Sequence, residues 1–320
     1  MKVTGRLKYG LLAVVALALA FTSCEKEVKI NFKGSDPKVV VEGAIEYGLP
    51  PYVILTHSIG YFERINPDVL QNSYLHGAKI SVTDGMRSVA LKEYIIDTPI
   101  GGTNYKFSIY SVDVTDPDAL QFTGQYEKFY TLNIKTEDGQ EFSAVTKIPQ
   151  PKPVDSMWVQ APPSPPKPGA VQLFVQYSDP DTIGNCVKYW TQRRFQAYDS
   201  LTGQLKYYNT GFVAGLNSSY NDEIINGSSI RIVLDAGYDR SNPDLNLDTY
   251  GYFFRGDTIV LKWSAIDRAT YDFWSTLDFA YSSTGNPFAS PVQILGNLKG
   301  GALGVWAGYG TTYDTLIVPK

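Results

Sequence analysis

Histidine and cysteine are scarce in this 320-residue chain, which contains two of each. The histidines are His57 and His76, and neither belongs to an HExxH motif or to a histidine pair at helical spacing. Ser58 follows His57 within an alternating segment, so their side chains point to opposite faces and predict no serine triad. A GxSxG elbow and a GxxxxGK phosphate loop are also missing from the sequence. We therefore predict a chain that is not an enzyme and needs no cofactor and no metal.

Basic residues are few as well, because 28 Lys and Arg stand against 32 Asp and Glu, a net charge of -4. Three of the basic residues, Lys2, Arg6 and Lys8, precede an apolar run. Without them 25 basic and 32 acidic residues remain, a net charge of -7. Phosphate backbones are bound by clustered Lys and Arg, which this composition does not offer, so we expect no nucleic-acid partner.

The first residues predict export and lipidation. A basic start is followed by the apolar run Leu11 to Phe21 and by Thr22-Ser23-Cys24. The run is shorter than the roughly 20 apolar residues that span a bilayer. We predict a signal peptide over residues 1–23, cleaved before Cys24, whose thiol then carries acyl chains such as palmitate. Each buried methylene contributes about 0.8 kcal/mol, so several chains would hold the protein firmly on a membrane.

Lipidation of Cys24 leaves Cys186 as the only free thiol, so no intramolecular disulfide can form and stability must come from apolar burial. No histidine or basic cluster surrounds Cys186 in the sequence, and we expect it to be a small core residue. Residues 24–37 are charged, carry few large apolar side chains and predict a flexible lipidated tether.

Residues 38–150 show the period of two that is typical of half-buried strands, for example in Tyr52 to His57 and Tyr105 to Tyr110. Asp84-Gly85 and Asp138-Gly139 separate pairs of such segments and predict two tight hairpins, because this dipeptide tolerates a positive φ. About seven strands are expected, enough for an N-terminal β-sandwich.

Three prolines between Pro149 and Pro153 break strand pairing and mark the predicted start of a second β domain, residues 151–320. Its fold class is again a β-sandwich, immunoglobulin-like or transthyretin-like. The strands expected here include the pair Val187 to Tyr198 and Leu205 to Tyr208, and a last strand at Thr315 to Val318. The glycine-rich segment Gly296 to Gly310 leads to that strand, and its glycines would permit close backbone packing or a tight hairpin.

One helix is expected in the mature chain, over residues 268–281. Asp267 is a good N-cap residue, and apolar side chains recur after it at spacings of three and four. Trp274 belongs to this apolar face, so we expect it to be buried against the second sandwich.

Two acidic loops, Asp179 to Asp181 and Asp239 to Asp248, place oxygen ligands at alternating positions. An EF-hand is excluded, because Thr249 and Arg255 stand where its glycine and glutamate would be needed. Irregular calcium binding and ordinary solvated turns remain the two alternatives.

The sequence resembles a known lipoprotein family, grouped as domain of unknown function 4249, over nearly all of the mature chain. The motifs that carry the resemblance are Val39-Val40-Val41-Glu42-Gly43, Ile148-Pro149, Gly256-Asp257-Thr258-Ile259, Trp263, Ile266-Asp267, Tyr271-Asp272-Phe273-Trp274 and Gly300-Gly301-Ala302-Leu303-Gly304-Val305-Trp306. The resemblance implies an outer-membrane lipoprotein of a Gram-negative bacterium, often encoded beside a TonB-dependent receptor. It implies no catalytic residue, since none is established for the family, and Trp306 stands where phenylalanine is expected more often.

Two functional hypotheses follow. The first is a non-enzymatic accessory or ligand-binding component of a TonB-dependent uptake complex. In lipoproteins that this chain resembles, acidic residues after the lipidated cysteine accompany display on the cell surface, so the resemblance implies such display for Glu25-Lys26-Glu27, with an ordinary charged spacer as the alternative. The second is a surface glycan-binding adhesin or a glycan-active enzyme with two carboxylates. The 23 tyrosines fit an extracellular binder, but they would also pack well on sheet faces, so the ligand and its contact residues stay unknown.

Overall fold

The computed structural model describes residues 36–60, 66–100, 103–199, 202–238, 247–283, 290 and 292–320. The predicted signal peptide, Cys24 and nearly all of the predicted tether lie outside these residues, so these expectations stay predictions. Residues Pro37–Lys320 form one unit. None of the helices within the described ranges is long and apolar enough to cross a membrane.

Strands dominate the described residues, which confirms the mostly β fold class. The first seven strands are β1 (Val39–Glu46), β2 (Tyr52–His57), β3 (Lys79–Thr83), β4 (Ser88–Ile100), β5 (Thr103–Val112), β6 (Phe129–Lys135) and β7 (Glu141–Lys147). The others are β8 (Ser156–Gln160), β9 (Ala170–Ser178), β10 (Cys186–Tyr198), β11 (Leu205–Asn209), β12 (Ser219–Asn221), β13 (Ser229–Leu234), β14 (Phe253–Phe254), β15 (Thr258–Ile266) and β16 (Leu303–Ile317). The helices are α2 (Pro67–Asn72), α3 (Pro117–Leu120), the 3-10 turn η1 (Leu247–Thr249) and α4 (Arg268–Ser283).

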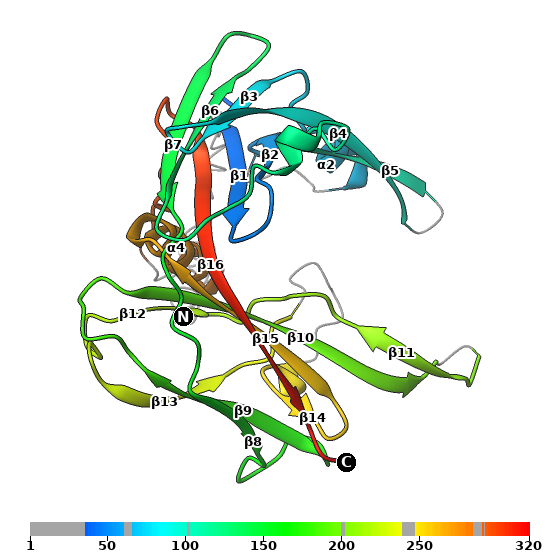
Figure 1. Ribbon diagram of the computed structural model, residues 1–320. Helices are drawn as coiled ribbons and strands as arrows, with labels where there is room; N and C mark the ends of the chain where they lie inside the picture. Colours follow the sequence, from blue (N-terminus) through cyan, green and yellow to red (C-terminus); the bar gives the residue numbers. More distant parts are fainter. Residues whose placement is uncertain are drawn as a thin grey trace, which may run out of the picture. The chain divides into compact units, whose positions relative to one another are not determined.

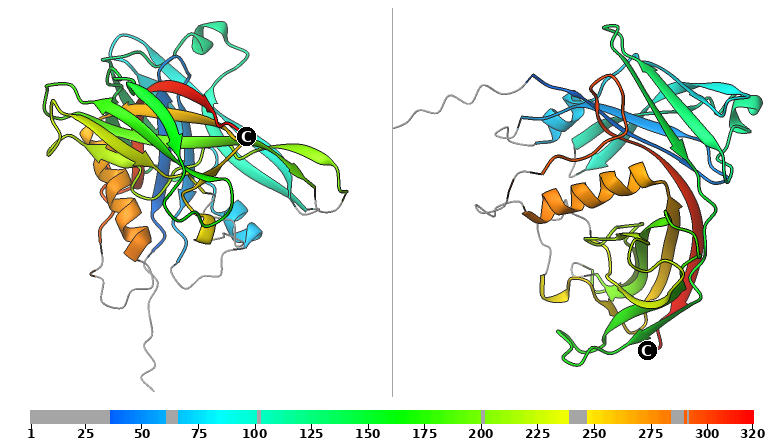
Figure 2. Two further views of the ribbon diagram at one scale, coloured as in Figure 1. Left: turned by 90° about the horizontal axis from the view of Figure 1, so that it is seen from below. Right: turned by 90° about the vertical axis from the view of Figure 1, so that its left-hand side faces the viewer.

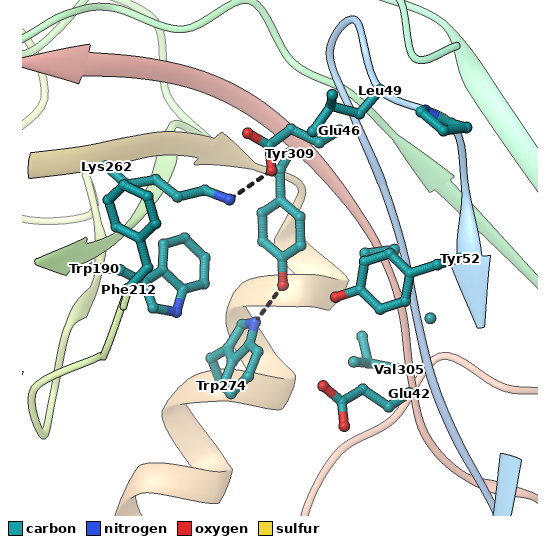
Figure 3. A pocket seen from close by; sticks show the side chains of 13 residues that line it. Glu42, Glu46, Leu49, Tyr52, Trp190, Phe212, Lys262, Trp274, Val305 and Tyr309 are labelled. Carbon is teal, nitrogen blue, oxygen red and sulfur yellow. Dashed lines mark hydrogen bonds and ion pairs between the residues drawn. The ribbon is translucent and has the colours of Figure 1, made fainter. Parts of the chain in front are cut away.

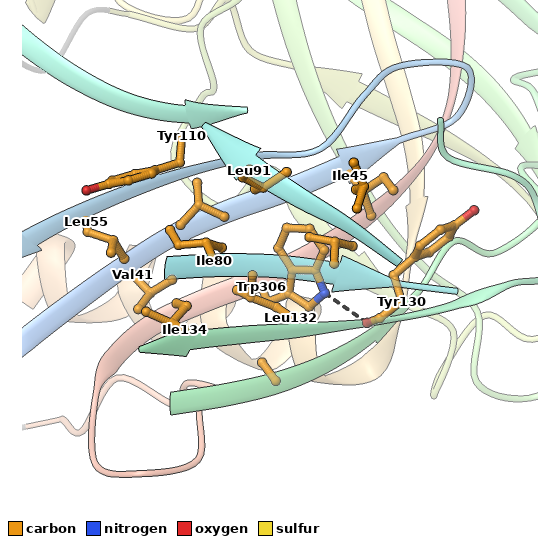
Figure 4. Close-up of a cluster of buried hydrophobic side chains, with 14 of the residues drawn as sticks. Val41, Ile45, Leu55, Ile80, Leu91, Tyr110, Tyr130, Leu132, Ile134 and Trp306 are labelled. Atoms are coloured by element: carbon orange, nitrogen blue, oxygen red, sulfur yellow. Dashed lines mark hydrogen bonds between the residues drawn. The ribbon is translucent and has the colours of Figure 1, made fainter. Parts of the chain in front are cut away.

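Seven strands lie between residues 38 and 150, as the alternating pattern predicts. Both aspartate-glycine hairpins are confirmed, since β3 pairs with β4 across Gly85 and β6 pairs with β7 across Gly139. The two glycines have φ values of 88° and 89°, a conformation that other residues rarely adopt. These strands curl around one core, in which Trp306 of β16 lies among side chains of β1, β2, β3, β4 and β6 (Figure 4).

β16 is longer than the sequence predicts and begins inside the glycine-rich segment. The expected last strand at Thr315 to Val318 is only its end. Its first half pairs in parallel with β1, and its second half pairs antiparallel with β15 (Figure 1). Gly304 has φ 104°, and a Cβ there would lie 1.9 Å from the Val41 carbonyl oxygen. The glycines thus permit close backbone packing, one of the two roles expected of them, but they do so within a strand.

The second core lies between two sheets and has the layers of a β-sandwich. β8, β9, β13 and β14 form a four-stranded sheet, and its buried side chains meet those of β10 and β15 from the large sheet. The predicted pairing of β10 with β11 is present. The large sheet is continuous, in the order β11-β10-β15-β16-β1-β2-β5-β4-β3-β6-β7, so β16 joins the segments before and after residue 150. The domain boundary at 150/151 itself stays a prediction.

α4 confirms the predicted helix and extends it to Ser283. Asp267 caps it, because its Oδ1 accepts a hydrogen bond from the Thr270 amide at 2.8 Å. The helix packs on the large sheet, on the inner side of the curve of β16 (Figure 2).

Two expectations about helices are wrong. Trp274 was expected to be buried against the second sandwich, but its side chain is half-buried and lines a cavity. The expectation of a single helix is also wrong, because α2 and α3 are present.

Candidate functional site

A cavity of about 270 Å³ lies on one face of the large sheet, at the side where α4 packs (Figure 3). Side chains of a strand alternate between faces, so Val41 and Ile45 enter the first core while Glu42, Ala44 and Glu46 turn to the cavity. The residues that line the cavity are Glu42, Gly43, Ala44, Glu46, Leu49, Pro50, Tyr52, Trp190, Phe212, Lys262, Trp274, Val305 and Tyr309.

Strand register brings the polar wall together from distant parts of the sequence. Glu46 lies opposite Tyr309 on β16, and Lys262 of β15 lies opposite Tyr313. Lys262 Nζ is 2.5 Å from one oxygen of Glu46, and Tyr313 Oη donates a hydrogen bond to the other at 2.8 Å. Both oxygens of Glu46 are therefore engaged within the protein. This ion pair joins β1 to β15 across β16.

Aromatic rings line the cavity next to this ion pair, with Lys262 Nζ 5.1 Å from the centroid of Trp190 and 5.8 Å from that of Tyr309. Trp190 meets Tyr309 edge to face, with centroids 5.3 Å apart, and meets Trp274 in the same way at 6.4 Å. Trp274 Nε1 donates a hydrogen bond to Tyr309 Oη at 3.0 Å, which fixes the helix to β16. In Figure 3, Tyr52 faces these rings across the cavity. The walls are pre-organised by contacts made within the protein.

Two lysines already cover faces of these rings. Lys188 is fully buried, and its Nζ lies 4.4 Å from the centroid of Trp274. Its charge is close to Asp278, also buried, at 4.0 Å, and it donates a hydrogen bond to Ser218 at 2.8 Å. Lys262 Nζ lies 5.1 Å from the centroid of Trp190. Each such cation–π contact is attractive because the ring face is electron-rich.

Glu42 differs from Glu46, because its carboxylate makes no hydrogen bond or ion pair to any residue in the described part of the chain. The side chain of Glu42 is exposed, but the surrounding protein reduces its hydration and raises its pKa above the ordinary 4.5. Burial and the negative charges of Glu42 and Glu46 raise the pKa of Tyr52 to about 12. Because Glu46 is paired with Lys262, Glu42 gives the lining of the cavity one unpaired negative charge and one free acceptor.

Neither histidine lines the cavity. His76 Nδ1 contacts the Glu93 carboxylate. Ser58 Oγ accepts a hydrogen bond from the Lys38 amide at 3.0 Å, and within the described ranges no hydrogen bond joins it to His57. Cys186 is confirmed as a core residue, 3% exposed, and burial raises the pKa of its thiol to about 12. A thiol with that pKa stays protonated at neutral pH and is a poor nucleophile.

In the first acidic loop, Asp179 to Asp181, a carboxylate binds a backbone amide. Asp179 is buried, and its Oδ2 accepts a hydrogen bond from the Gly227 amide at 3.3 Å. Burial and the nearby charge of Asp222 raise the pKa of Asp179. Residues 239–246 of the second loop lie outside the described residues. Among the residues that the structure places, no three His, Cys, Asp or Glu side chains lie together as a metal site would require.

None of the cavity residues was predicted as a ligand contact from the sequence. The sequence does mark Glu42 as a candidate site residue, because a charged residue follows the apolar run Val39-Val40-Val41 and shares a strand face with Glu46. The partners come from β10, β15, α4 and β16, and only long-range pairing brings them to β1.

The fold and the cavity define a mostly β protein with a cavity lined by aromatic and acidic side chains. Residues 25–314 match the family described as domain of unknown function (DUF4249), and the chain belongs to this family. No curated protein matches the chain.

Proposed function

We propose that this protein is a non-enzymatic outer-membrane lipoprotein, anchored through Cys24, that acts as a ligand-binding accessory component of a TonB-dependent uptake complex. The observation that carries the ligand-binding role is the cavity, in which Glu42 is free and the rings are held in place. Binding pockets typically combine aromatic walls with a few placed polar groups. The membrane anchor is supported by the N-terminal sequence, and the receptor is supported by what the family resemblance implies.

The glycan-active enzyme is the less favoured candidate. Glycoside hydrolysis needs two carboxyl groups that act on one bond from defined positions. Glu42 and Glu46 line the same cavity, but Glu46 is held by Lys262 and Tyr313. A carboxylate engaged in this way is a poor nucleophile or base. One free carboxylate beside aromatic rings favours binding.

A membrane anchor would strengthen a weak contact between this protein and its receptor. A flexible tether over residues 24–37 would confine the folded unit next to its receptor and raise the effective concentration to about the millimolar range. A contact that is weak in solution would then be occupied on the membrane. The acidic residues that follow Cys24 support placement on the cell surface.

Gentle detergent extraction at native expression tests the proposal. A tagged wild-type chain should be recovered together with a TonB-dependent receptor, whereas Cys24→Ala should be recovered without it because the tether no longer confines the chain. Protease added to whole cells should degrade the wild-type protein. Recovery of the wild-type chain alone would refute the receptor, and full protection in intact cells would refute surface display.

A further inference from the structure

The charges around the cavity limit what it can bind. An anion would be repelled by Glu42, whose carboxylate has no cationic partner in the described part of the chain. A ligand cation over these rings would approach Lys188, whose Nζ lies 4.4 Å from the centroid of Trp274, and Lys262, whose Nζ lies 5.1 Å from that of Trp190. Like charges held this close would repel it. A neutral ligand is repelled neither by the carboxylate nor by the two lysines.

The size of the cavity and its free groups narrow the choice further. Its volume of about 270 Å³ lies slightly below the roughly 300 to 1,000 Å³ of pockets for drug-sized ligands, so it suits one ring with its substituents. The Glu42 carboxylate is an acceptor without a partner in the described part of the chain, and a ligand that donates hydrogen bonds would satisfy it. Tyr52 Oη adds a donor and acceptor opposite the rings (Figure 3).

We propose that the cavity binds a single neutral sugar ring, a hexopyranose, with its hydroxyl groups on Glu42 and Tyr52 and its C–H face on the half-buried rings of Trp190 and Trp274. This inference rests on the proposed ligand-binding function and names its ligand class. A hexopyranose is uncharged, donates from several hydroxyls and presents apolar C–H groups on its faces. Those properties match the free carboxylate, the tyrosine hydroxyl and the aromatic walls.

Intrinsic tryptophan fluorescence of the full-length protein in detergent provides the test. Of the five tryptophans, Trp190 and Trp274 line the cavity, Trp263 and Trp306 are fully buried in the cores, and Trp158 on β8 does not line the cavity, so a ligand should change mainly the first pair. The probes are D-glucose, D-galactose, D-mannose and their methyl glycosides, with tetramethylammonium as a cationic probe. At least one neutral probe should give a saturable change. Its affinity should not depend on salt between about 0.05 and about 0.5 M, because the ligand carries no charge.

Variants connect the signal to the cavity. Glu42→Gln should weaken the sugar by about tenfold, since a charge-assisted hydrogen bond becomes a neutral one. Tyr52→Phe should weaken it several-fold. Glu137→Gln, an exposed residue outside the cavity, should leave the affinity unchanged.

The proposal is overturned if no neutral probe gives a saturable change. It is also overturned if only tetramethylammonium binds, with an affinity that falls with salt and is lost in Glu42→Gln. Either result would leave the uptake-complex function standing if the receptor is still recovered with the protein. Loss of the receptor with sugar binding intact would instead refute that complex alone.

Discussion

At the scale of single residues, Trp306 shows how the first core is specified. Its ring is fully buried, and its Nε1 donates a hydrogen bond to the Tyr130 carbonyl oxygen at 2.9 Å. The ring fits because residue 43 is glycine, where a Cβ would approach Trp306 to 2.8 Å. Gly43 and Trp306 both belong to the family motifs in the sequence, and the structure gives the physical reason for their pairing.

Trp306→Ala should lower the free energy of unfolding by about 3 to 5 kcal/mol, because it leaves a cavity and an unpaired carbonyl group. Trp306→Phe should cost less, since it retains most of the apolar ring. Tyr207→Ala is the matched control, because Tyr207 is 84% exposed and should change stability by less than about 0.5 kcal/mol. Reversible urea unfolding measures all three. A cost for Trp306→Ala as small as that of Tyr207→Ala would contradict the assignment of Trp306 to the core.

The contributions of Glu42 and Glu93 to the free energy of unfolding should change with pH in opposite directions. Reduced hydration raises the pKa of Glu42 above 4.5, so its contribution to stability is present at acid pH and is lost as the pH rises through the folded pKa. Burial would also raise the pKa of Glu93, but hydrogen bonds from Ser108, from the Gly77 amide and from His76 lower it to about 2. Glu93 therefore stabilises the fold above the unfolded pKa, and this contribution is lost as the pH falls through the folded pKa.

At neutral pH, Glu42→Gln should raise the free energy of unfolding and Glu93→Gln should lower it. Both differences from the wild type should shrink as the pH falls toward about 3. Urea unfolding over this pH range checks the signs. Equal signs for the two variants at neutral pH would show that the account of one environment is wrong.

At the scale of elements, Asp267 has two roles in placing α4. One oxygen caps the helix at Thr270, and the other accepts hydrogen bonds from Thr146 Oγ1 at 2.8 Å and from the Lys147 amide at 3.0 Å. Thr146 and Lys147 belong to β7, so this one side chain connects the helix to the first seven strands. Loss of Asp267 would disturb both contacts.

Asp267→Ala should cost about 2 to 4 kcal/mol, the sum of a lost N-cap and of partly buried donors left unpaired. Asp267→Asn should fall between this variant and the wild type, because it keeps the capping oxygen. Asp272→Ala removes only an exposed ion pair with Arg268 and should cost less than about 0.5 kcal/mol. Thermal and urea unfolding compare the three variants. Similar losses for Asp267→Ala and Asp272→Ala would mean that the bridge to β7 contributes little.

Local patterns in the sequence predicted some of the strands and helices and missed others. Aspartate-glycine turns and alternating runs predicted the hairpins, and an N-cap with an apolar period predicted α4. The short helices α2 and α3 were missed because six and four residues are too few for a period, although Asn66 and Asp116 cap them. The start of β16 was missed because its glycines suppress the alternating pattern, and its parallel partner β1 lies more than 250 residues away.

At the scale of the whole molecule, β16 connects all parts of the described unit. Trp306 of this strand lies in the first core, its Tyr309 lines the cavity, and its Leu316 packs at the edge of the second core. The cavity depends on this strand, because it holds β1 beside β15 and so places Glu46 against Lys262. The sequence could predict a mostly β fold and the helix α4, but it could not predict a site assembled by pairings between its two ends.

The proposed role also depends on the membrane anchor, and metabolic labelling with radioactive palmitate tests it most directly. The wild-type chain should incorporate the label. Cys186→Ala should incorporate it as well, because that thiol is buried in the fold. Cys24→Ala should remain unlabelled at equal expression. A labelled Cys24→Ala chain, or an unlabelled wild-type chain, would contradict anchoring at this cysteine and with it the proposed lipoprotein.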